Sequence, residues 1–334
     1  MIIQGMTASP ALSTTSAAPI VTNRVPAVPA GPVLEGVCAL PHLGVIRVQG
    51  VDAATFLQGQ LTQDVLTMAP GEARLAAFCS AKGRMQASFQ VLKRAVAAAA
   101  PDSTPVGASA DSEFLLVCSR DILAATCKRL SMFVMRAKAR LTDASDELAL
   151  FGLLGQAVAS APGAILALPP AGGVARALCV LPAGESPPPG VPLDVGLWLW
   201  AEVQSGIGRI TQPTVEAFVP QMLNYESVGG VNFKKGCYPG QEVVARSQFR
   251  GTLKRRAYLV HSKGAMAPGD VVFGAADADQ ACGTVVLAAA AGGEWDAIVS
   301  MQVAAAQAGG LTLGLPKGAA IELLALPYEL LEDI

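Results

Sequence analysis

Reactive and cationic side chains gather in one segment of the chain, residues 232–256, which reads NFKKGCYPGQEVVARSQFRGTLKRR. This segment holds seven of the chain's 24 lysines and arginines against a single acid, and Cys237 lies near its start. A cysteine reacts as its thiolate, and neighbouring cations stabilise the thiolate form. Lys234, Lys235 and Arg246 could therefore raise the reactivity of Cys237. Residue chemistry alone leaves a reactive thiol and an inert, buried thiol equally open.

The residues around this cysteine suit a turn that binds a ligand. Gly236 and Gly240 lack a Cβ atom, which lets backbone and ligand approach closely. The Pro-Gly pair that ends in Gly240 favours a tight turn that presents the thiol or Tyr238. Gln241 supplies an amide and Glu242 the local carboxylate, so either could orient a ligand. The segment is therefore the first candidate for a functional site.

Composition limits the classes of protein that fit. A chain of 334 residues can fold into two or three domains. Its formal net charge of -2 predicts no polyanionic partner, although basic residues concentrate in residues 74–94, 120–140 and 232–256. No apolar run approaches the roughly 20 residues that span a bilayer, because prolines and glycines interrupt residues 157–181. We expect a soluble protein with no membrane contact.

Seven cysteines and two histidines are spread along the chain without the spacing of metal ligands. The cysteines include no CxxC pair, and their odd number favours free thiols in a reducing compartment. Without a cluster of cysteines and histidines, a zinc site is not expected. Neither His42 nor His261 lies in a context typical of a Ser-His-Asp hydrolase. The sequence predicts a cytoplasmic protein with no metal site.

Hydrophobic periodicity predicts two α+β units followed by a small β-barrel. We expect a flexible leader at 1–33, a first unit at 34–147, a second unit at 148–255 and the barrel at 256–334. Asp52 is expected to cap a helix, and a basic turn at 82–84 to join two strands. The expected strands are 44–50, 73–79, 85–92, 113–119, 134–141, 148–154, 257–260, 271–273, 283–288, 295–303 and 319–324, and further helices are expected at 120–130 and 193–205.

Residues 235–242, KGCYPGQE, resemble the K-G-C-Y-x-G-Q-E signature of the YgfZ-type folate-binding proteins. These proteins are relatives of the glycine-cleavage T-protein and support iron–sulfur enzymes and tRNA modification. We call residues 235–242 the signature loop. The resemblance runs from about residue 36 to 328 and includes DAATFLQGQLTQD at 52–64, AKGR at 81–84, FRG at 249–251, KR at 254–255 and LPY at 326–328.

The resemblance implies a T-protein-like fold, in which two ferredoxin-like α+β units form a folate-binding region and a C-terminal β-barrel completes a ring-like arrangement. It implies tetrahydrofolate or a one-carbon derivative as cofactor, and Cys237 as a functional thiol that faces the central opening. Trp198 stands where the family has a tryptophan associated with folate binding, but a core position in its helix explains it equally well. Leu43 replaces a second family tryptophan. Arg84 and Lys82 are candidates for pairing with the glutamate tail of folate.

The same resemblance extends folate binding to the rest of the signature loop and the residues after it. These further expected folate-binding residues are Lys235, Gly236, Tyr238, Gly240, Gln241, Glu242 and Arg246.

One departure from the T-protein pattern bears on mechanism. T-proteins carry an Asp-Asp pair after the glycine-rich turn, whereas this chain has Gln86-Ala87-Ser88, with no ionisable group to act as a general base. Gln204-Ser205-Gly206 stands where relatives often have Glu-Ala-Gly. Both changes argue against glycine-cleavage chemistry and leave open whether the protein is an enzyme.

Three functions remain as hypotheses. The first is a folate-binding accessory protein that maintains or repairs iron–sulfur clusters, with iron–sulfur enzymes or assembly proteins, some of them tRNA-modifying, as partners. The second is a folate-dependent one-carbon transferase. The third is a tRNA-binding module that uses the basic clusters. Aromatic residues in the basic segment are few (Tyr238, Phe249, Tyr258), so stacking on single-stranded bases has little support.

Overall fold

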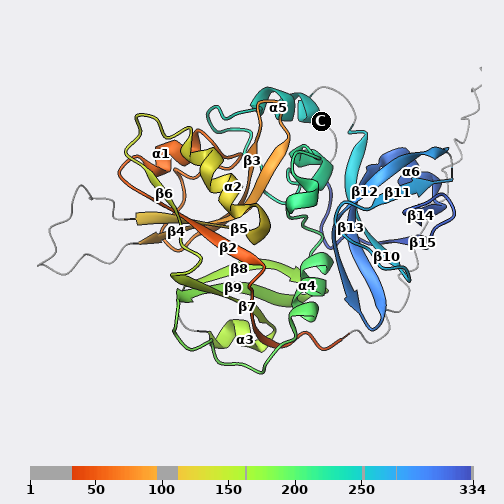
Figure 1. Ribbon diagram of the computed structural model, residues 1–334, viewed down its shortest axis with the longest axis horizontal. Helices are drawn as coiled ribbons and strands as arrows, with labels where there is room; N and C mark the ends of the chain where they lie inside the picture. The colour runs from red at the N-terminus through yellow and green to blue at the C-terminus, as the bar shows by residue number, and fades with distance from the viewer. Residues whose placement is uncertain (1–31, 96–111, 162–163, 250–252, 276, 332–334) are drawn as a thin grey trace, which may run out of the picture. The chain divides into compact units, whose positions relative to one another are not determined.

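The computed structural model describes residues 32–95, 112–161, 164–249, 253–275 and 277–331. The predicted leader lies outside these residues, apart from Pro32 and Val33. Within the described residues, no helix is both long and apolar enough to cross a membrane. Two antiparallel sheets carry helices, and a closed β-barrel follows them (Figure 1), which confirms the predicted α+β class.

The first sheet has five antiparallel strands in the order β3-β4-β5-β2-β6. Its strands bury apolar side chains such as Phe78 and Phe89 in one core with Leu57 of α1 and Ile122 of α2. The basic turn at 82–84 joins β3 to β4, as predicted. The elements are β2 (Leu43–Gln49), α1 (Ala53–Gln58), β3 (Ala73–Cys79), β4 (Met85–Ala95), β5 (Ser112–Ser119), α2 (Arg120–Ser131) and β6 (Arg140–Asp143).

The second sheet has four antiparallel strands in the order β1-β7-β9-β8. Its first strand in the chain, β1, precedes the whole first sheet, so the two α+β parts are interleaved in sequence. Asp194 caps α4 through a carboxylate that accepts from the backbone N–H of Gly196 at 2.8 Å. The elements are β1 (Gly36–Ala39), β7 (Leu148–Leu154), α3 (Gln156–Ser160), β8 (Ala164–Ala171), β9 (Val174–Pro182) and α4 (Val195–Gln204).

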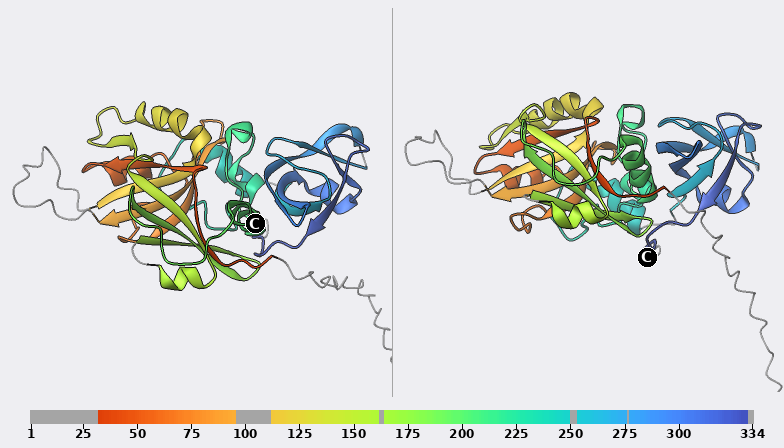
Figure 2. Two further views of the ribbon diagram at one scale, coloured as in Figure 1. Left: turned by 60° about the horizontal axis from the view of Figure 1, so that its bottom comes forward. Right: turned by 90° about the horizontal axis from the view of Figure 1, so that it is seen from below.

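The C-terminal barrel closes in the order β10-β13-β12-β11-β14-β15 and can be followed in Figure 2. Inward-facing side chains such as Val260, Val285, Val299 and Met301 fill its core. The predicted barrel is thus confirmed, with a short helix α6 and strand β14 that the sequence did not indicate. The elements are β10 (Arg255–Ser262), β11 (Val271–Gly274), β12 (Asp277–Ala291), β13 (Glu294–Gln302), α6 (Val303–Ala308), β14 (Leu311–Leu313) and β15 (Ala320–Leu324).

The segment between α4 and the barrel joins the three parts into one packed body. It contains η1 (Gln212–Thr214), η2 (Pro220–Leu223) and α5 (Gln241–Phe249). The amide of Asn224 donates to the carbonyl of Ala257 (2.9 Å) and accepts from its N–H (3.2 Å), which ties η2 to β10. Trp200 of α4 donates its indole N–H to Asp296 of β13 (2.7 Å). These contacts link η2 and α4 to the barrel strands.

Two local predictions were wrong. Residues 134–141 do not form a strand, because the chain turns after α2 and only Arg140–Asp143 pairs with β2. In that turn, the N–H of Ala137 donates to the carbonyl of Val134 at 2.7 Å, and Val134 and Ala137 pack on the core. Asp52 precedes α1 but does not cap it. Its carboxylate accepts from the backbone N–H of Lys138 at 2.7 Å instead.

Candidate functional site

The signature loop packs directly on the β3–β4 turn. Gly240 has φ +78, and a Cβ atom there would lie 2.4 Å from the carbonyl oxygen of Ser80 and 2.6 Å from the Cα of Gly83. Gly83 has φ +70, and its Cβ would lie 2.9 Å from the Cβ of Val243. Both glycines are needed because a side chain at either position would collide with its neighbour. The AKGR and KGCYPGQE segments are therefore two halves of one contact.

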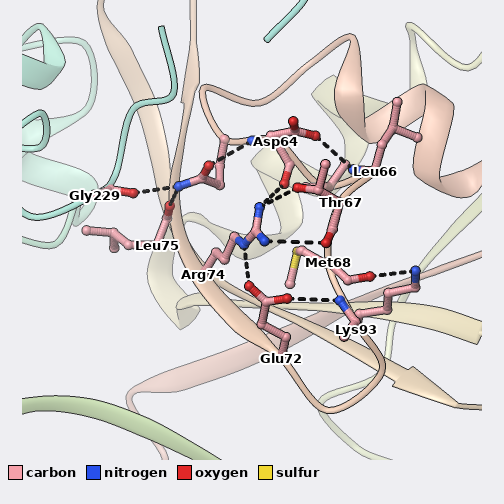
Figure 3. Close-up of polar contacts among 12 residues, drawn as sticks. Asp64, Leu66, Thr67, Met68, Glu72, Arg74, Leu75, Lys93 and Gly229 are labelled. Atoms are coloured by element: carbon pink, nitrogen blue, oxygen red, sulfur yellow. Dashed lines mark hydrogen bonds and ion pairs between the residues drawn. The ribbon is translucent and has the colours of Figure 1, made fainter. Parts of the chain in front are cut away.

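A second set of hydrogen bonds fixes the chain just before the loop. Thr62 donates to the carbonyl of Gly230 (2.6 Å) and accepts from Ala77 (2.8 Å). The side chain of Gln63 donates to the carbonyl of Gly229 at 2.5 Å, and Gly229 is labelled in Figure 3. Arg74 holds the adjacent loop through the carbonyl of Asp64 (2.6 Å; Figure 3). These contacts hold the chain in place just before the signature loop, and we call residues 62–64 with their partners in β3 the platform of the loop.

Lys235 is an anchor within this platform and is 7% exposed. Its ammonium donates to the carbonyls of Gln58 and Leu61, the latter at 2.5 Å, and lies 4.9 Å from the ring centroid of Tyr238. Burial lowers the pKa of Lys235 to about 8, against the opposing effect of the Asp64 and Cys237 charges. Lys235 was a candidate for stabilising the Cys237 thiolate, but its ammonium is bound to these backbone carbonyls.

Cys237 differs from every other cysteine in the chain. All seven lie in the described residues, and only Cys237 is exposed, while Cys127 is half-buried and the rest are buried. Burial raises the pKa of Cys79 and of Cys118 to about 12, so these thiols stay protonated and inert. The structure thus has one accessible thiol. It lies on a loop held by the β3–β4 turn and by the carbonyls of Gln58 and Leu61.

The other predicted residues of the loop have mixed surroundings. Tyr238 is buried, which raises the pKa of its phenol, and the carboxylate of Glu242 pairs with Arg246 at 2.6 Å on the exposed face of α5. Gly236 is exposed, and a Cβ atom there would meet nothing within 4 Å. Gln241 begins α5, its N–H donating to the carbonyl of Tyr238 at 3.2 Å.

On the β3–β4 turn, Lys82 is exposed, whereas Arg84 donates to the carbonyl of Ala217 at 2.6 Å. Arg84 therefore holds the 216–218 segment against β4. The N–H of Met85 also donates to the carbonyl of Phe218, at 2.8 Å. The structure brings these turn residues and the signature loop together, but it sets Trp198 apart from them, in the core of the second sheet.

Trp198 lines a cleft between the two sheets and is only 1% exposed. Gly152 packs against its indole, since a Cβ at Gly152 would lie 2.5 Å from the ring, and the Arg176 guanidinium lies 4.9 Å from the ring centroid. The indole N–H of Trp198 and the Nε–H of Arg176 have no hydrogen-bond partner among the described residues. Burial lowers the pKa of Arg176 to about 10. Two buried donors without partners in one cleft call for an acceptor.

An ion pair that the sequence did not indicate lies between this cleft and a second one. Arg209 and Glu202 line both clefts, and the guanidinium donates twice to the carboxylate at 3.1 Å. Arg209 also donates to Ser119 at the start of α2 (2.9 Å), and His42 lies 4.0 Å from Glu202. No motif marks Glu202 and Arg209, which are seven residues apart, and Ser119 and His42 lie far from them in the chain, which is why sequence reasoning missed this group.

Burial and the charge of Arg209 set the protonation of Glu202 and His42. Burial raises the pKa of Glu202, but the Arg209 charge and hydrogen bonds outweigh burial and leave it at about 2. Glu202 is therefore ionised at neutral pH and too weak a base to accept a proton. Burial lowers the pKa of His42 and favours the neutral imidazole. His42 is thus the better proton acceptor of the two.

Metal binding has no built site in the part of the chain that the structure describes. Among these residues, no group of three or more His, Cys, Asp or Glu is placed to hold a metal ion.

The chain resembles known proteins in sequence and in fold. No protein-family model matches it. It is 31% identical over 252 residues to the tRNA-modifying protein YgfZ of Edwardsiella ictaluri, covering 67% of this chain and 70% of that protein. It is 29% identical over 253 residues to the tRNA-modifying protein YgfZ of Klebsiella pneumoniae (69% and 72% covered). An uncharacterized protein of Haemophilus influenzae is 30% identical over 223 residues (66% and 71% covered).

Among solved structures, the glycine cleavage system aminomethyltransferase T from Bartonella henselae matches with a TM-score of 0.59. The match covers 87% of this chain and 85% of that one at 14% sequence identity. At this identity the likeness shows a shared fold, which confirms the predicted T-protein-like architecture.

Proposed function

The chain belongs to the family of the tRNA-modifying protein YgfZ, and we propose that it is a folate-binding accessory protein that supports assembly or repair of iron–sulfur clusters, including those of tRNA-modifying enzymes. The observation that carries the proposal is Cys237, the one exposed thiol among seven cysteines, on a loop built against the β3–β4 turn. Iron–sulfur clusters are held by about four ligands, mostly thiolates. A single thiol cannot hold a cluster alone, so Cys237 would act on a cluster held by a partner protein, or on the sulfur of that cluster.

The thiol is tested in a strain that lacks this gene, by measuring the activity of an iron–sulfur enzyme in extracts. Wild-type protein and Cys127→Ser should restore activity, whereas Cys237→Ser should leave it near the level of the deletion. Cys127 is a suitable control because it is half-buried on α2 and is not part of the signature loop. Full restoration by Cys237→Ser, at equal protein abundance, would show that the thiol has no such role.

Two unpartnered donors beside Trp198 support the proposed folate site. The unpartnered N–H groups of Trp198 and Arg176 are donors suited to a pterin carbonyl or a carboxylate, both of which folate carries. Bound tetrahydrofolate would supply a one-carbon unit or a reduced pterin. The protein's part is to hold it with these buried donors and to keep water out of the cleft. Lys82, which is exposed, remains a candidate partner for the glutamate tail.

Folate binding should depend on Trp198 far more than on its neighbour Trp200. Trp198→Phe removes the free indole donor, so we expect tetrahydrofolate to bind roughly 5- to 30-fold more weakly, as for loss of one buried hydrogen bond. Trp200→Phe removes a donor that is already bound to Asp296 and is the matched control. The measurement is tetrahydrofolate titration followed by the remaining tryptophan fluorescence. Equal affinities for the two variants would contradict a folate site at Trp198.

A folate-dependent one-carbon transferase is the second candidate function. Although the Asp-Asp pair is missing, His42 offers a neutral base 4.0 Å from Glu202, which lines both clefts. This function requires turnover, which an accessory role does not. Purified protein with methylene-tetrahydrofolate and an amine acceptor should then consume the folate in step with product, and His42→Gln should stop it. Without turnover in the wild type, the accessory role stands.

A further inference from the structure

A cleft of about 850 Å³ lies between α5, η2 and the barrel elements β10 and α6. Its lining includes the cations Arg246, Lys254 and Arg255 and no acidic side chain. Arg246 forms an ion pair with Glu242 at 2.6 Å. No described carboxylate forms an ion pair with Lys254 or Arg255. Uncompensated positive charge in a concave surface attracts a polyanion.

Glutamine amides line the same cleft and add hydrogen-bonding groups of both kinds. Gln302 and Gln307 are exposed, while Gln221 is fully buried. Gln221 donates its amide N–H to the carbonyl of Val244 at 2.7 Å, which fixes the orientation of the amide. Its carbonyl oxygen then has no donor among the described residues. Amides in this position suit the mixed donor and acceptor edges of nucleobases.

An exposed aromatic ring lies on the same helix. Phe249 of α5 is 52% exposed and contacts Phe233 edge-on at 5.3 Å between ring centroids. It follows Arg246 by three residues, so the two side chains are neighbours on α5, and Phe249 lies at the rim of the cleft rather than in its lining. An aromatic ring beside a cationic groove is the arrangement on which single-stranded bases stack. Stacking had little support before the fold was known, because local sequence does not show which aromatic residue is exposed beside the cations.

We propose that this cleft binds a single-stranded segment of RNA, with phosphates on Lys254 and Arg255 and a base on Phe249. The proposal rests on the proposed function and deepens it by giving the protein a direct RNA contact. Arg246 lies about 7.5 Å along α5 from its first residue, Gln241, at 1.5 Å per residue. RNA in the cleft is therefore within one or two helical turns of the loop that carries Cys237.

The test is fluorescence anisotropy of the full chain with a 5′-labelled, 12-nucleotide single-stranded RNA at 50 to 200 mM salt, with unfractionated tRNA as competitor. Lys254→Ala/Arg255→Ala should weaken binding at least 10-fold and reduce the slope of log affinity against log salt by about 1.4, for two lost contacts to a single strand. Phe249→Leu should weaken binding to the single strand roughly 5-fold or more while leaving binding to a duplex unchanged. Lys138→Ala/Arg140→Ala, which removes two exposed cations beside β6, is the control of equal charge and should bind as wild type.

Three results would overturn the proposal. The first is no RNA binding by the wild type at 50 mM salt. The second is an equal loss in the control double variant, which would mean that any surface charge suffices. The third is competition by polyglutamate as effective as that by tRNA, which would indicate a site for an acidic protein.

Failure of the RNA site and failure of the proposed function give different results. If only the RNA site is wrong, Cys237→Ser still fails to restore the iron–sulfur enzyme while RNA binding is absent or unspecific. If the proposed function is wrong, Cys237→Ser restores the enzyme fully, whatever the RNA binding shows.

Discussion

Replacing Arg209 by methionine should lower the free energy of unfolding by about 3 kcal/mol or more, the usual cost of leaving one charge of a buried pair without its partner. Arg209 donates two hydrogen bonds to Glu202 and one to Ser119, so its loss also frees the start of α2 from the cleft. Urea denaturation at pH 7 measures the change. The double variant Glu202→Gln/Arg209→Met, which removes both charges, should recover part of the loss and is the matched control.

Acid titration gives this prediction a second readout. The pKa of Glu202 is about 2 in the folded protein against an ordinary 4.5, so the unfolded chain binds its proton first. The pair therefore contributes stability above about pH 5, and that contribution is lost as pH falls towards 2. The lowered pKa of Glu202 thus corresponds to a stabilisation of a few kcal/mol, on the order of 3 kcal/mol. An Arg209→Met protein as stable as wild type, with the same acid dependence, would contradict a coupled pair.

Gly240→Ala should be the most damaging single change in the signature loop. Its backbone has φ +78, which costs an alanine about 1 kcal/mol, and the added Cβ would meet backbone atoms of Ser80 and Gly83 that cannot rotate away. We expect a loss of about 2–4 kcal/mol from these two effects together. Faster amide hydrogen exchange in residues 236–244 should accompany it, because the loop leaves the β3–β4 turn.

Gly236→Ala is the control for that substitution within the same loop. A Cβ at Gly236 would meet nothing within 4 Å, so unfolding should change by less than about 0.5 kcal/mol. If this stable variant nevertheless binds folate or supports clusters poorly, Gly236 is needed for the approach of a ligand. Equal stability losses at 236 and 240 would contradict the described docking of the loop.

Much of the fold could be read from the sequence because many of its strands are short, largely apolar runs separated by turn residues. The expected strand at 73–79 is β3, and the basic turn after it, like the closed barrel, was also expected. Helix α5 was not expected, because a Pro-Gly pair and two adjacent valines (Val243, Val244) disfavour a helix locally. Packing of that helix on Gly83 outweighs this local preference.

The candidate site could be predicted only in part. The KGCYPGQE pattern pointed to Cys237, which is the exposed thiol. The pattern does not tell an activating lysine from an anchoring one, and Lys235 is buried on the carbonyls of Gln58 and Leu61. Nor could it bring Glu202 and Arg209 to His42, since only the folded chain joins residues so far apart. Burial and long-range pairing are set by tertiary packing, which local sequence does not encode.

We propose Cys237, held by its platform, as the group through which this protein supports iron–sulfur chemistry in tRNA modification. The most direct measurement is the amount of a modified nucleoside made by an iron–sulfur enzyme, in tRNA hydrolysates from the deletion strain that expresses Cys237→Ser. We predict that the nucleoside stays near its level in the deletion strain, while Cys127→Ser restores it. Wild-type levels with Cys237→Ser at equal protein abundance would show that the thiol has no part in this chemistry.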